Sequence, residues 1–441
     1  MAALLSAPKG WPAVLLARAG KLDPEAGLPA AEKAGAWSAW REALNGGPDA
    51  VVRRVDEAGL RGRGGAGYPA AAKWRAVRTQ PSRTRYAVLN GYEADPGTVA
   101  VRTLLETDPW AVVEGLAIAA YAVGAREAYL AVRADAALAV RRLRAVLAAA
   151  QEAGYLGHDI LGSGVDLEIE LREVEGAFVL GEETVLLRAL EGKRGMPDQR
   201  PPYPAERGLW GEPTLVNSAA TLAAVPWIVT HGAKAYRELG TSEFPGTLLL
   251  QLAGAVRRPG VVEVPTGTTV GQVVEKAGGG ASGTVKAVLV GGPSGGFLPP
   301  EALATPLTPG ALGEAGAILG SGSLLVLDQS ACIVELATLM ERFMNDESCG
   351  KCIPCRIGTR RLTEIGDRFM TGRARPADPQ LLQDLAADVR DGSLCGHGIT
   401  APNPLVSGMR YFGAEFQEHA VHGRCPAGVC APLRVAAGGT R

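Results

Sequence analysis

Short apolar runs of strand length alternate with longer segments of helical character in the first half of the chain. The runs that predict strands lie at residues 85–90, 128–132 and 167–172. The segments that predict helices lie at residues 49–58, 110–123 and 135–153. Strands that alternate with helices are typical of an α/β domain with a largely parallel sheet. In front of this domain, residues 1–50 predict short helices and loops.

The pattern changes near residue 244. Residues 248–256 and 261–264 predict two strands around the turn Arg258-Pro259-Gly260, which is a hairpin signal. A helix at 269–277 and a strand at 287–290 follow, and together they fit a small β-grasp-like module. From about residue 331 the pattern becomes helical, with the cysteines expected on turns between helices. We therefore expect four parts, at residues 1–50, 51–244, 245–327 and 328–441.

Composition excludes several functional classes. The 441 residues carry 45 Lys and Arg against 46 Asp and Glu, a net charge of −1. This balance argues against a nucleic-acid binder that works through bulk charge. There is no run of about eighteen uncharged apolar residues that would span a membrane. The first thirty residues carry charges such as Lys9 and Asp23 and no cleavable apolar core, so we expect no signal peptide and a cytoplasmic protein.

All seven cysteines lie in the last 110 residues. In a cytoplasmic protein, cysteines gathered at one end indicate metal binding rather than disulfides. Cys349, Cys352 and Cys355 form a C-x-x-C-x-x-C run, and Cys395 follows forty residues later. A tight triplet with one distant thiolate favours a [4Fe–4S] cluster. The alternative is a structural zinc site with a spare thiol, but zinc ligands commonly come in two separated pairs.

The remaining cysteines are Cys332, Cys425 and Cys430, and His419 lies six residues before the second of them. Three thiols and one imidazole make a tetrahedral zinc set. Spacing alone leaves two alternatives open: an inert buried thiol at Cys332 and a solvent-facing His419, with His422 as a competing ligand.

A glycine-rich segment, Gly62-x-Gly64-x-x-Gly67, matches the dinucleotide-binding pattern, but it follows a predicted helix and not a strand. Arg61, Arg63 and Lys73 surround it, and backbone N–H groups of such a loop can hold phosphate. The alternative is a plain glycine turn. A second segment, Gly181-Glu182-Glu183-Thr184, is explained more simply as the acidic start of a helix than as a contact to a polar cofactor tail.

Four motifs occur together in the chain, at residues 59–67, 181–184, 208–211 and 347–352. With them the chain resembles the NADH-binding flavoprotein subunit of respiratory complex I, over about residues 50 to 430. This family includes the flavoprotein subunits of NAD-linked hydrogenases and formate dehydrogenases. Residues 291–296, 400–404 and 425–430 look most like the subunits of multimeric, often electron-bifurcating, hydrogenases.

The resemblance implies a Rossmann-like FMN- and NADH-binding domain at 51–244, a soluble-ligand-binding β-grasp module at 245–327, and a helical [4Fe–4S] domain at 328–441. It implies an NADH dehydrogenase subunit, in which a hydride passes from NADH to FMN and electrons pass singly to the cluster, in some relatives with flavin-based bifurcation. The implied partners are a [2Fe–2S] thioredoxin-like subunit and a larger iron–sulfur or catalytic subunit of the hydrogenase, formate dehydrogenase or complex I type. It also strengthens the zinc prediction, with Cys332, His419, Cys425 and Cys430 as ligands.

The resemblance also implies the roles of individual residues. The implied contacts to FMN are Gly62, Arg63, Gly64 and Lys73, with Asn90, Glu93 and Asn217 nearby. Asp95 is expected beside the flavin and the nicotinamide, and with Glu93 it forms the predicted catalytic pair. Gly181, Glu182 and Glu183 are expected at the NADH pocket, where Tyr68 and Tyr203 retain aromatic positions that stack on adenine.

The chain departs from the family pattern around the flavin and the nucleotide. Tyr92 replaces an aspartate of the family pattern, and Ala76 replaces an aromatic residue. Arg200 replaces a lysine, Ser218 replaces an asparagine and Phe178 replaces a tyrosine. They support a second hypothesis, a structural or electron-wiring homologue that keeps the cluster but has lost or altered nucleotide turnover. A third hypothesis is a small-ligand-binding module that acts through the β-grasp segment.

Overall fold

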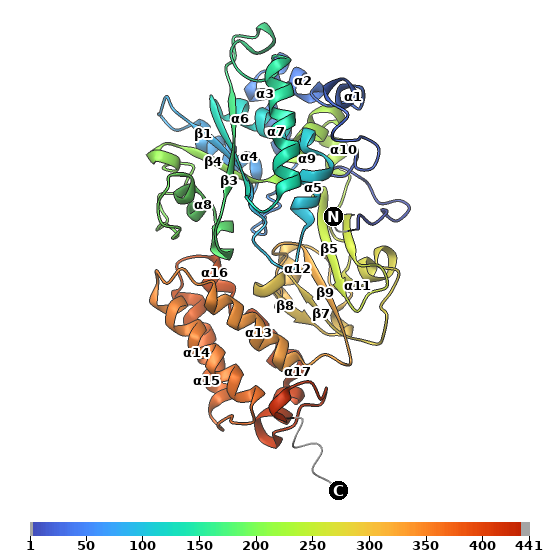
Figure 1. Cartoon of the computed structure of the whole chain (residues 1–441), viewed down its shortest axis with the longest axis vertical. Helices are drawn as coiled ribbons and strands as arrows, with labels where there is room; N and C mark the ends of the chain where they lie inside the picture. The colour runs from blue at the N-terminus through green and yellow to red at the C-terminus, as the bar shows by residue number, and fades with distance from the viewer. Residues whose placement is uncertain (1–2, 434–441) are drawn as a thin grey trace. The chain divides into compact units, whose positions relative to one another are not determined.

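The computed structural model describes residues 3–433. The chain, drawn in Figure 1, divides into two compact units. The first unit comprises the residues up to 94 together with residues 98–250 and 261–268. The second comprises residues 95–97 and 251–260 and those from 269 onward.

The first unit is built on a four-stranded sheet in the order β3-β2-β1-β4. Its strands are β1 (Tyr86–Gly91), β2 (Glu127–Arg133), β3 (Glu168–Val174) and β4 (Thr214–Ser218). Every neighbouring pair is parallel. The central strands are almost continuously buried, as expected for a parallel sheet covered by helices. The predicted strands and the α/β class are therefore confirmed.

Helices precede, connect and follow these strands (Figure 1). Their bounds are α1 (Leu28–Lys33), α2 (Ser38–Gly46), α3 (Pro48–Glu57), α4 (Ala70–Arg78), α5 (Ala100–Thr107), α6 (Pro109–Val123), α7 (Ala137–Glu152), α8 (Glu183–Leu190), α9 (Ala219–His231) and α10 (Ala233–Arg237), with the short 3-10 turns η1 (Ile160–Gly162), η2 (Phe178–Gly181) and η3 (Leu209–Gly211). Helix α6 begins where Asp108 accepts a hydrogen bond from the Ala111 N–H, and it ends at left-handed Gly124. Gly115 lets α6 approach α9, because a Cβ there would lie 2.0 Å from the Leu222 carbonyl oxygen.

Strand β4 lies on the opposite side of β1 from β2, so the winding of the sheet changes direction between β1 and β4. The register pairs Asn90 with Ser218 at the carboxyl ends of these two strands. In open parallel sheets, ligands bind outside the carboxyl ends of the strands at such a switch point. The fold therefore places the candidate site at this edge.

The second sheet has the order β6-β5-β9-β7-β8. Its strands are β5 (Thr247–Gly254), β6 (Gly260–Pro265), β7 (Val285–Val290), β8 (Gly296–Leu298) and β9 (Ser323–Asp328). β5 pairs in parallel with β9, while β7 is antiparallel to both β8 and β9. The short helical segments are α11 (Val270–Gln272), the π-helix η4 (Val273–Ala277), η5 (Gly292–Ser294), η6 (Pro300–Ala302) and α12 (Pro309–Glu314). The helix predicted at 269–277 is thus one α-helical turn that continues as a π-helix.

The C-terminal part of the second unit is helical. Its helices are α13 (Ile333–Asp346), α14 (Ile353–Met370), α15 (Asp378–Gly392), α16 (Gly396–Thr400) and α17 (Asn403–His422). The expectation that the cysteines lie on turns is wrong for Cys355, which lies in the first turn of α14. Pro354 explains this early start, because proline is well tolerated in the first turn of a helix. Among residues 3–433, no helix is long and apolar enough to cross a membrane.

Candidate flavin, nucleotide and metal sites

Two asparagines mark the edge where β1 and β4 end. The side-chain amide of Asn90 donates to the Gly181 carbonyl at 3.0 Å, and its oxygen accepts the Tyr92 N–H at 3.1 Å. The Asn217 oxygen accepts the indole N–H of Trp74 at 2.9 Å. Both predicted residues therefore lie at the switch point. Sequence reasoning missed Trp74, which holds Asn217 in place.

The glycine-rich loop joins α3 to α4, so it follows a helix as predicted. The Gly62 N–H donates to the Tyr68 carbonyl at 2.8 Å, which closes the loop. Gly64 lies against Ser218, since a Cβ on this glycine would be 3.5 Å from the serine Cβ. Ser218 also caps α9 by accepting the Thr221 N–H. The loop and the start of α9 thus meet at the end of β4, where backbone N–H groups favour an anion.

The guanidinium of Arg63, predicted to contact FMN, is engaged with the protein. It donates to the Thr247 carbonyl at 2.9 Å, to the Arg61 carbonyl at 3.0 Å and to the Tyr236 hydroxyl at 3.0 Å. It also lies 4.3 Å from the centre of the Phe244 ring. These contacts hold the glycine loop in place. A contact from Arg63 to FMN stays a prediction.

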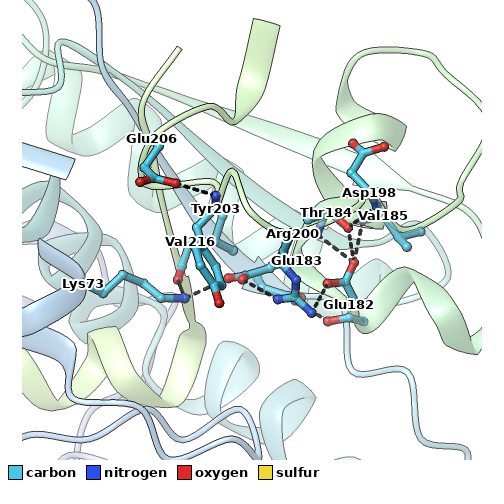
Figure 2. Close-up of polar contacts among 12 residues, drawn as sticks. Lys73, Glu182, Glu183, Thr184, Val185, Asp198, Arg200, Tyr203, Glu206 and Val216 are labelled. Carbon is cyan, nitrogen blue, oxygen red and sulfur yellow. Dashed lines mark hydrogen bonds and ion pairs between the residues drawn. The ribbon is translucent and has the colours of Figure 1, made fainter. Parts of the chain in front are cut away.

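Lys73, Glu183 and Arg200 form a chain of ion pairs (Figure 2). The Lys73 ammonium lies 2.8 Å from Glu183 Oε2 and donates to the Val216 carbonyl at 3.2 Å. The guanidinium of Arg200 donates to the other oxygen of Glu183 at 3.1 Å. The structure therefore brings together three predicted site residues that lie far apart in the sequence.

Glu182 has a different task from its neighbour. Its Oε2 accepts the N–H groups of Thr184 at 2.8 Å and of Val185 at 3.0 Å, and so caps α8. Its Oε1 lies 3.5 Å from Arg200 Nη2 (Figure 2). For Glu182 the structure thus supports the simpler interpretation, an acidic helix start. Glu183 instead turns its carboxylate to the two cations.

Two tyrosines offer open aromatic faces in the same unit. Tyr68 is 56% exposed and Tyr203 is 54% exposed, so both rings are accessible to a ligand. Both are the predicted adenine-stacking residues. The backbone N–H of Tyr203 donates to the Glu206 carboxylate at 2.8 Å, so its loop is fixed while the ring stays accessible (Figure 2).

Tyr92, Glu93 and Phe178, all predicted to contact a cofactor, are largely engaged or covered. Tyr92 is 2% exposed, and its hydroxyl donates to the Gly176 carbonyl. The Glu93 carboxylate accepts the N–H groups of Val101 at 2.7 Å and Arg102 at 2.9 Å, so it caps the start of α5. Phe178 is partly buried in η2. Their roles at the flavin stay predictions.

Asp95, the other predicted catalytic residue, is 5% exposed and lies in the second unit. It accepts the Gly97 N–H at 2.7 Å and the hydroxyl of Ser321. Burial raises the pKa of Asp95, although both hydrogen bonds act in the opposite direction. Gly292 has φ +72°, and a Cβ there would lie 2.0 Å from the Asp95 carboxylate. Sequence reasoning missed these neighbours, but the Gly291-Gly292 motif was a signal of this close approach.

The four cysteines of the predicted cluster are all free thiols, with Cys355 and Cys395 buried and Cys349 and Cys352 half-buried. Burial raises the pKa of Cys355 to about 12, and the charges of Cys352, Cys395 and Cys349 raise it further against a hydrogen bond from Ser348. These four thiols therefore lie close enough to interact. Four grouped cysteine thiols fit a [4Fe–4S] cluster. Ser348, 3.2 Å from the Cys355 sulfur, is a neighbour that sequence reasoning missed.

The second predicted metal set also comes together. The ligand atoms of Cys332, His419, Cys425 and Cys430 lie within 4.8 Å of one another. The Cys332 sulfur lies 3.4 Å from His419 Nε2 and 3.7 Å from the Cys430 sulfur. Tetrahedral zinc with ordinary bond lengths places two sulfurs about 3.8 Å apart, and a sulfur and a nitrogen about 3.6 Å apart. The donors fit one zinc ion.

Burial separates His419 from its competitor. His419 is completely buried, whereas the side chain of His422 is about half exposed and lies 4.0 Å from Glu418. The solvent-facing alternative for His419 is therefore wrong. The neighbouring Cys430 thiol and then burial raise the pKa of Cys332. A divalent cation among these thiols would reverse that effect, because metal binding favours the thiolate.

Comparison with known families matches three segments of the chain. Residues 55–227 match the Nuo51 FMN-binding domain. Residues 249–298 match the SLBB domain, and residues 335–419 match the NADH-ubiquinone oxidoreductase-F iron–sulfur binding region. These segments correspond to the parallel-sheet part, the mixed-sheet part and the helical part of the fold.

Whole-chain relatives agree. The NADP-reducing hydrogenase subunit HndC of Solidesulfovibrio fructosivorans is 43% identical over 388 residues, covering 88% of this chain and 79% of the relative. The chain belongs to the complex I 51-kDa family of FMN and iron–sulfur subunits. An NADH-quinone oxidoreductase subunit of Rhizobium meliloti is 40% identical over 90% of this chain and 94% of its own length. A crystal structure of NAD+-reducing [NiFe]-hydrogenase in the H2-reduced state superposes with a TM-score of 0.82 at 34% identity, covering 95% of this chain and 68% of that chain.

The family membership confirms the resemblance and the fold class. FMN and a [4Fe–4S] cluster are the cofactors named in the matching family descriptions. Zinc is named in none of the three matching descriptions, so the zinc set rests on its geometry in this chain.

Proposed function

We propose that this chain is the NADH-oxidising flavin subunit of a multisubunit oxidoreductase. It takes electrons from a nicotinamide dinucleotide and passes them through a [4Fe–4S] cluster to partner iron–sulfur subunits. The observation that carries the proposal is that one chain presents both a polar site at the switch point of a parallel sheet and a group of four cysteine thiols. FMN, when bound, accepts two electrons as a hydride and releases them one at a time.

The residues of the first unit would bind and orient the flavin and the dinucleotide. The glycine loop and the start of α9 would offer backbone N–H groups to the flavin phosphate, and Lys73, which also bonds to Glu183 and to the Val216 carbonyl, is the cationic contact that we propose for it. Asn90 and Asn217 lie at the strand ends, where a polar flavin tail is bound in folds of this kind. The exposed rings of Tyr68 and Tyr203 are the surfaces on which adenine stacks.

Asp95 follows β1 by four residues, and its buried carboxyl holds a proton more tightly than an ordinary aspartate does. We assign it the task of ordering the backbone that follows β1, through its bonds to Gly97 and Ser321. We assign Glu93 an indirect role, in which it positions the backbone, because its carboxylate caps α5.

The cysteine group would hold the [4Fe–4S] cluster, with Cys349, Cys352, Cys355 and Cys395 as ligands. His397 is buried beside it, and its Nε2 lies 2.7 Å from the Met344 carbonyl, so α16 is tied to the end of α13. A second ion, Zn²⁺, would bind Cys332, His419, Cys425 and Cys430 and join the start of α13 to the segment after α17. The role of this zinc ion is structural, because protein side chains would fill all four of its coordination positions.

The proposed partners are a [2Fe–2S] thioredoxin-like subunit and a larger iron–sulfur or catalytic subunit. Electrons that reach a single cluster need a further acceptor. Four of the seven cysteines are assigned to the [4Fe–4S] cluster and three to the zinc set, so the chain has no cysteines left for a second cluster. We also propose that the native complex carries out flavin-based electron bifurcation. Under this proposal, the native complex reduces ferredoxin with electrons from NADH or from hydrogen only when a second electron acceptor is also present.

The decisive experiment uses the purified chain, anaerobic, with its FMN and iron contents measured first. Addition of NADH should bleach the flavin absorbance and then give the spectroscopic signal of a reduced [4Fe–4S] cluster. If FMN and iron are fully present and neither NADH nor NADPH bleaches the flavin, the proposal fails. The electron-wiring homologue would then be the better description, and the departures at Tyr92 and Ala76 would be its explanation.

A further inference from the structure

The acidic pair at the nucleotide pocket is electrically neutralised within the protein. Glu183 bonds to Lys73 with one oxygen and to Arg200 with the other, and Glu182 lies 3.5 Å from the same guanidinium. Two carboxylates therefore face two cations (Figure 2). In dinucleotide sites, a free acidic residue binds the ribose 2′-hydroxyl and disfavours a 2′-phosphate, whereas a nearby arginine accommodates that phosphate.

We propose that Arg200 makes this chain accept 2′-phosphorylated dinucleotides, NADP(H), as well as NAD(H). The inference rests on the proposed function, because it names the substrate class of the same site. Its basis is the arginine itself: a lysine at this position could cancel charge, but it would lack the planar fork that binds a phosphate with two parallel hydrogen bonds.

Arg200 has donors to spare. A guanidinium carries five N–H groups, and within residues 3–433 that of Arg200 donates one hydrogen bond, to Glu183. Its side chain is 29% exposed, so a ligand can reach the remaining N–H groups. The next carboxylate along this segment, Asp198, is already paired with Arg188 at 3.0 Å and does not compete for Arg200.

The neighbouring tyrosine gives the ligand its orientation. Tyr203 lies three residues after Arg200 and is 54% exposed, with its backbone fixed by Glu206. If adenine stacks on this ring, the ribose attached to it stays close to the chain segment that carries Arg200. The 2′-position is on that ribose, so we expect a phosphate there to bind the Arg200 guanidinium.

Two ligands that differ only in the phosphate test this proposal. The FMN-loaded chain is titrated calorimetrically with ADP-ribose and with 2′-phospho-ADP-ribose. We expect both to bind to the unaltered chain. The Arg200→Lys variant should lose about tenfold or more in affinity for the phosphorylated ligand and change less than about threefold for ADP-ribose, as loss of one charge-assisted hydrogen bond implies. Flavin bleaching by NADPH and by NADH should divide in the same way.

Arg207→Gln is the matched control, because it removes an exposed positive charge from the same loop. It should weaken the phosphorylated ligand by less than about twofold, as expected for a screened surface charge. If ADP-ribose binds and 2′-phospho-ADP-ribose does not, the inference is wrong while the proposed function stands. It is also wrong if Arg200→Lys weakens both ligands equally. If neither ligand binds to an FMN-loaded chain, the proposed nucleotide site itself fails.

Discussion

The imidazole Nε2 of His419 lies 3.4 Å from the sulfur of Cys332, although 87 residues separate them in the sequence. Cys332 is the N-cap of α13, and His419 lies in the last turn of α17. The two helices therefore share one buried polar point. Burying polar side chains in an apolar core is unfavourable unless each of them has a bonding partner. A zinc ion would bind the imidazole and the three thiolates at once.

The zinc set makes a prediction about metal content. The purified chain should contain about one zinc and about four irons. Cys430→Ser should lose the zinc and keep the iron, because Cys430 belongs to the buried group at Cys332 and not to the four cluster thiols. Elemental analysis measures both metals in one sample. Joint loss of zinc and iron would contradict two separate sites.

The converse change concerns the cluster. Cys355→Ser should remove most of the iron and the visible absorbance of the cluster, because the thiolate is the ligand that iron–sulfur clusters require. Zinc and FMN should remain near their original contents, since Cys355 belongs to neither site. Metal analysis and flavin release by denaturation check this. Retention of four irons would mean that another group replaces Cys355.

Much of the fold follows from the sequence for a simple physical reason. Strands such as β1 and helices such as α6 bury most of their residues, so apolar residues dominate both segments. The grouping of Cys332, His419, Cys425 and Cys430 was also predictable, because cysteine is rare in this chain and its spacing limits which residues can meet, while zinc at this group stays a prediction. Here the residue type carries the chemistry.

The details of the flavin site were less predictable, because charged residues there serve two tasks. The sequence motifs suggested that Arg63 and Glu93 contact the flavin. In the structure the Arg63 side chain donates to backbone carbonyl groups, and the Glu93 carboxylate caps a helix. The bond between Asp95 and Ser321 joins positions 226 residues apart, and no local pattern indicates it. The direction in which a polar side chain points depends on such distant neighbours.

A glycine between helices gives a stability prediction. Gly115→Ala should destabilise the chain by about 1–3 kcal/mol or more, because the new Cβ would lie 2.0 Å from the Leu222 carbonyl oxygen and force α6 away from α9. Gly46→Ala is the control, since its Cβ would make only an ordinary contact at 3.7 Å with Ala50. Urea unfolding measures both. Equal free energies of unfolding for the two variants would contradict the close approach of these helices.

Glu114 makes the stability of the chain depend on pH. It is fully buried in α6, and its carboxylate accepts the Trp40 N–H at 3.0 Å. Burial raises the pKa of Glu114 to about 7, although the Trp37 N–H, the charge of Arg18 and the Trp40 N–H all act to lower it. The folded chain therefore binds this proton more tightly than the unfolded chain does, in which the pKa is near its ordinary value of 4.5.

Stability from this group is then fully present below about pH 4.5 and is lost as the pH rises to about 7. The loss is on the order of 2–3 kcal/mol in the free energy of unfolding. Glu114→Gln keeps the shape of the protonated side chain and cannot ionise, so it should remove this part of the pH dependence. Urea unfolding at several pH values between about 5 and about 8 should show the variant gaining on the unaltered chain as pH rises, since other titrating groups cancel in the difference. Parallel curves for the two proteins would show that Glu114 stays ionised throughout this range.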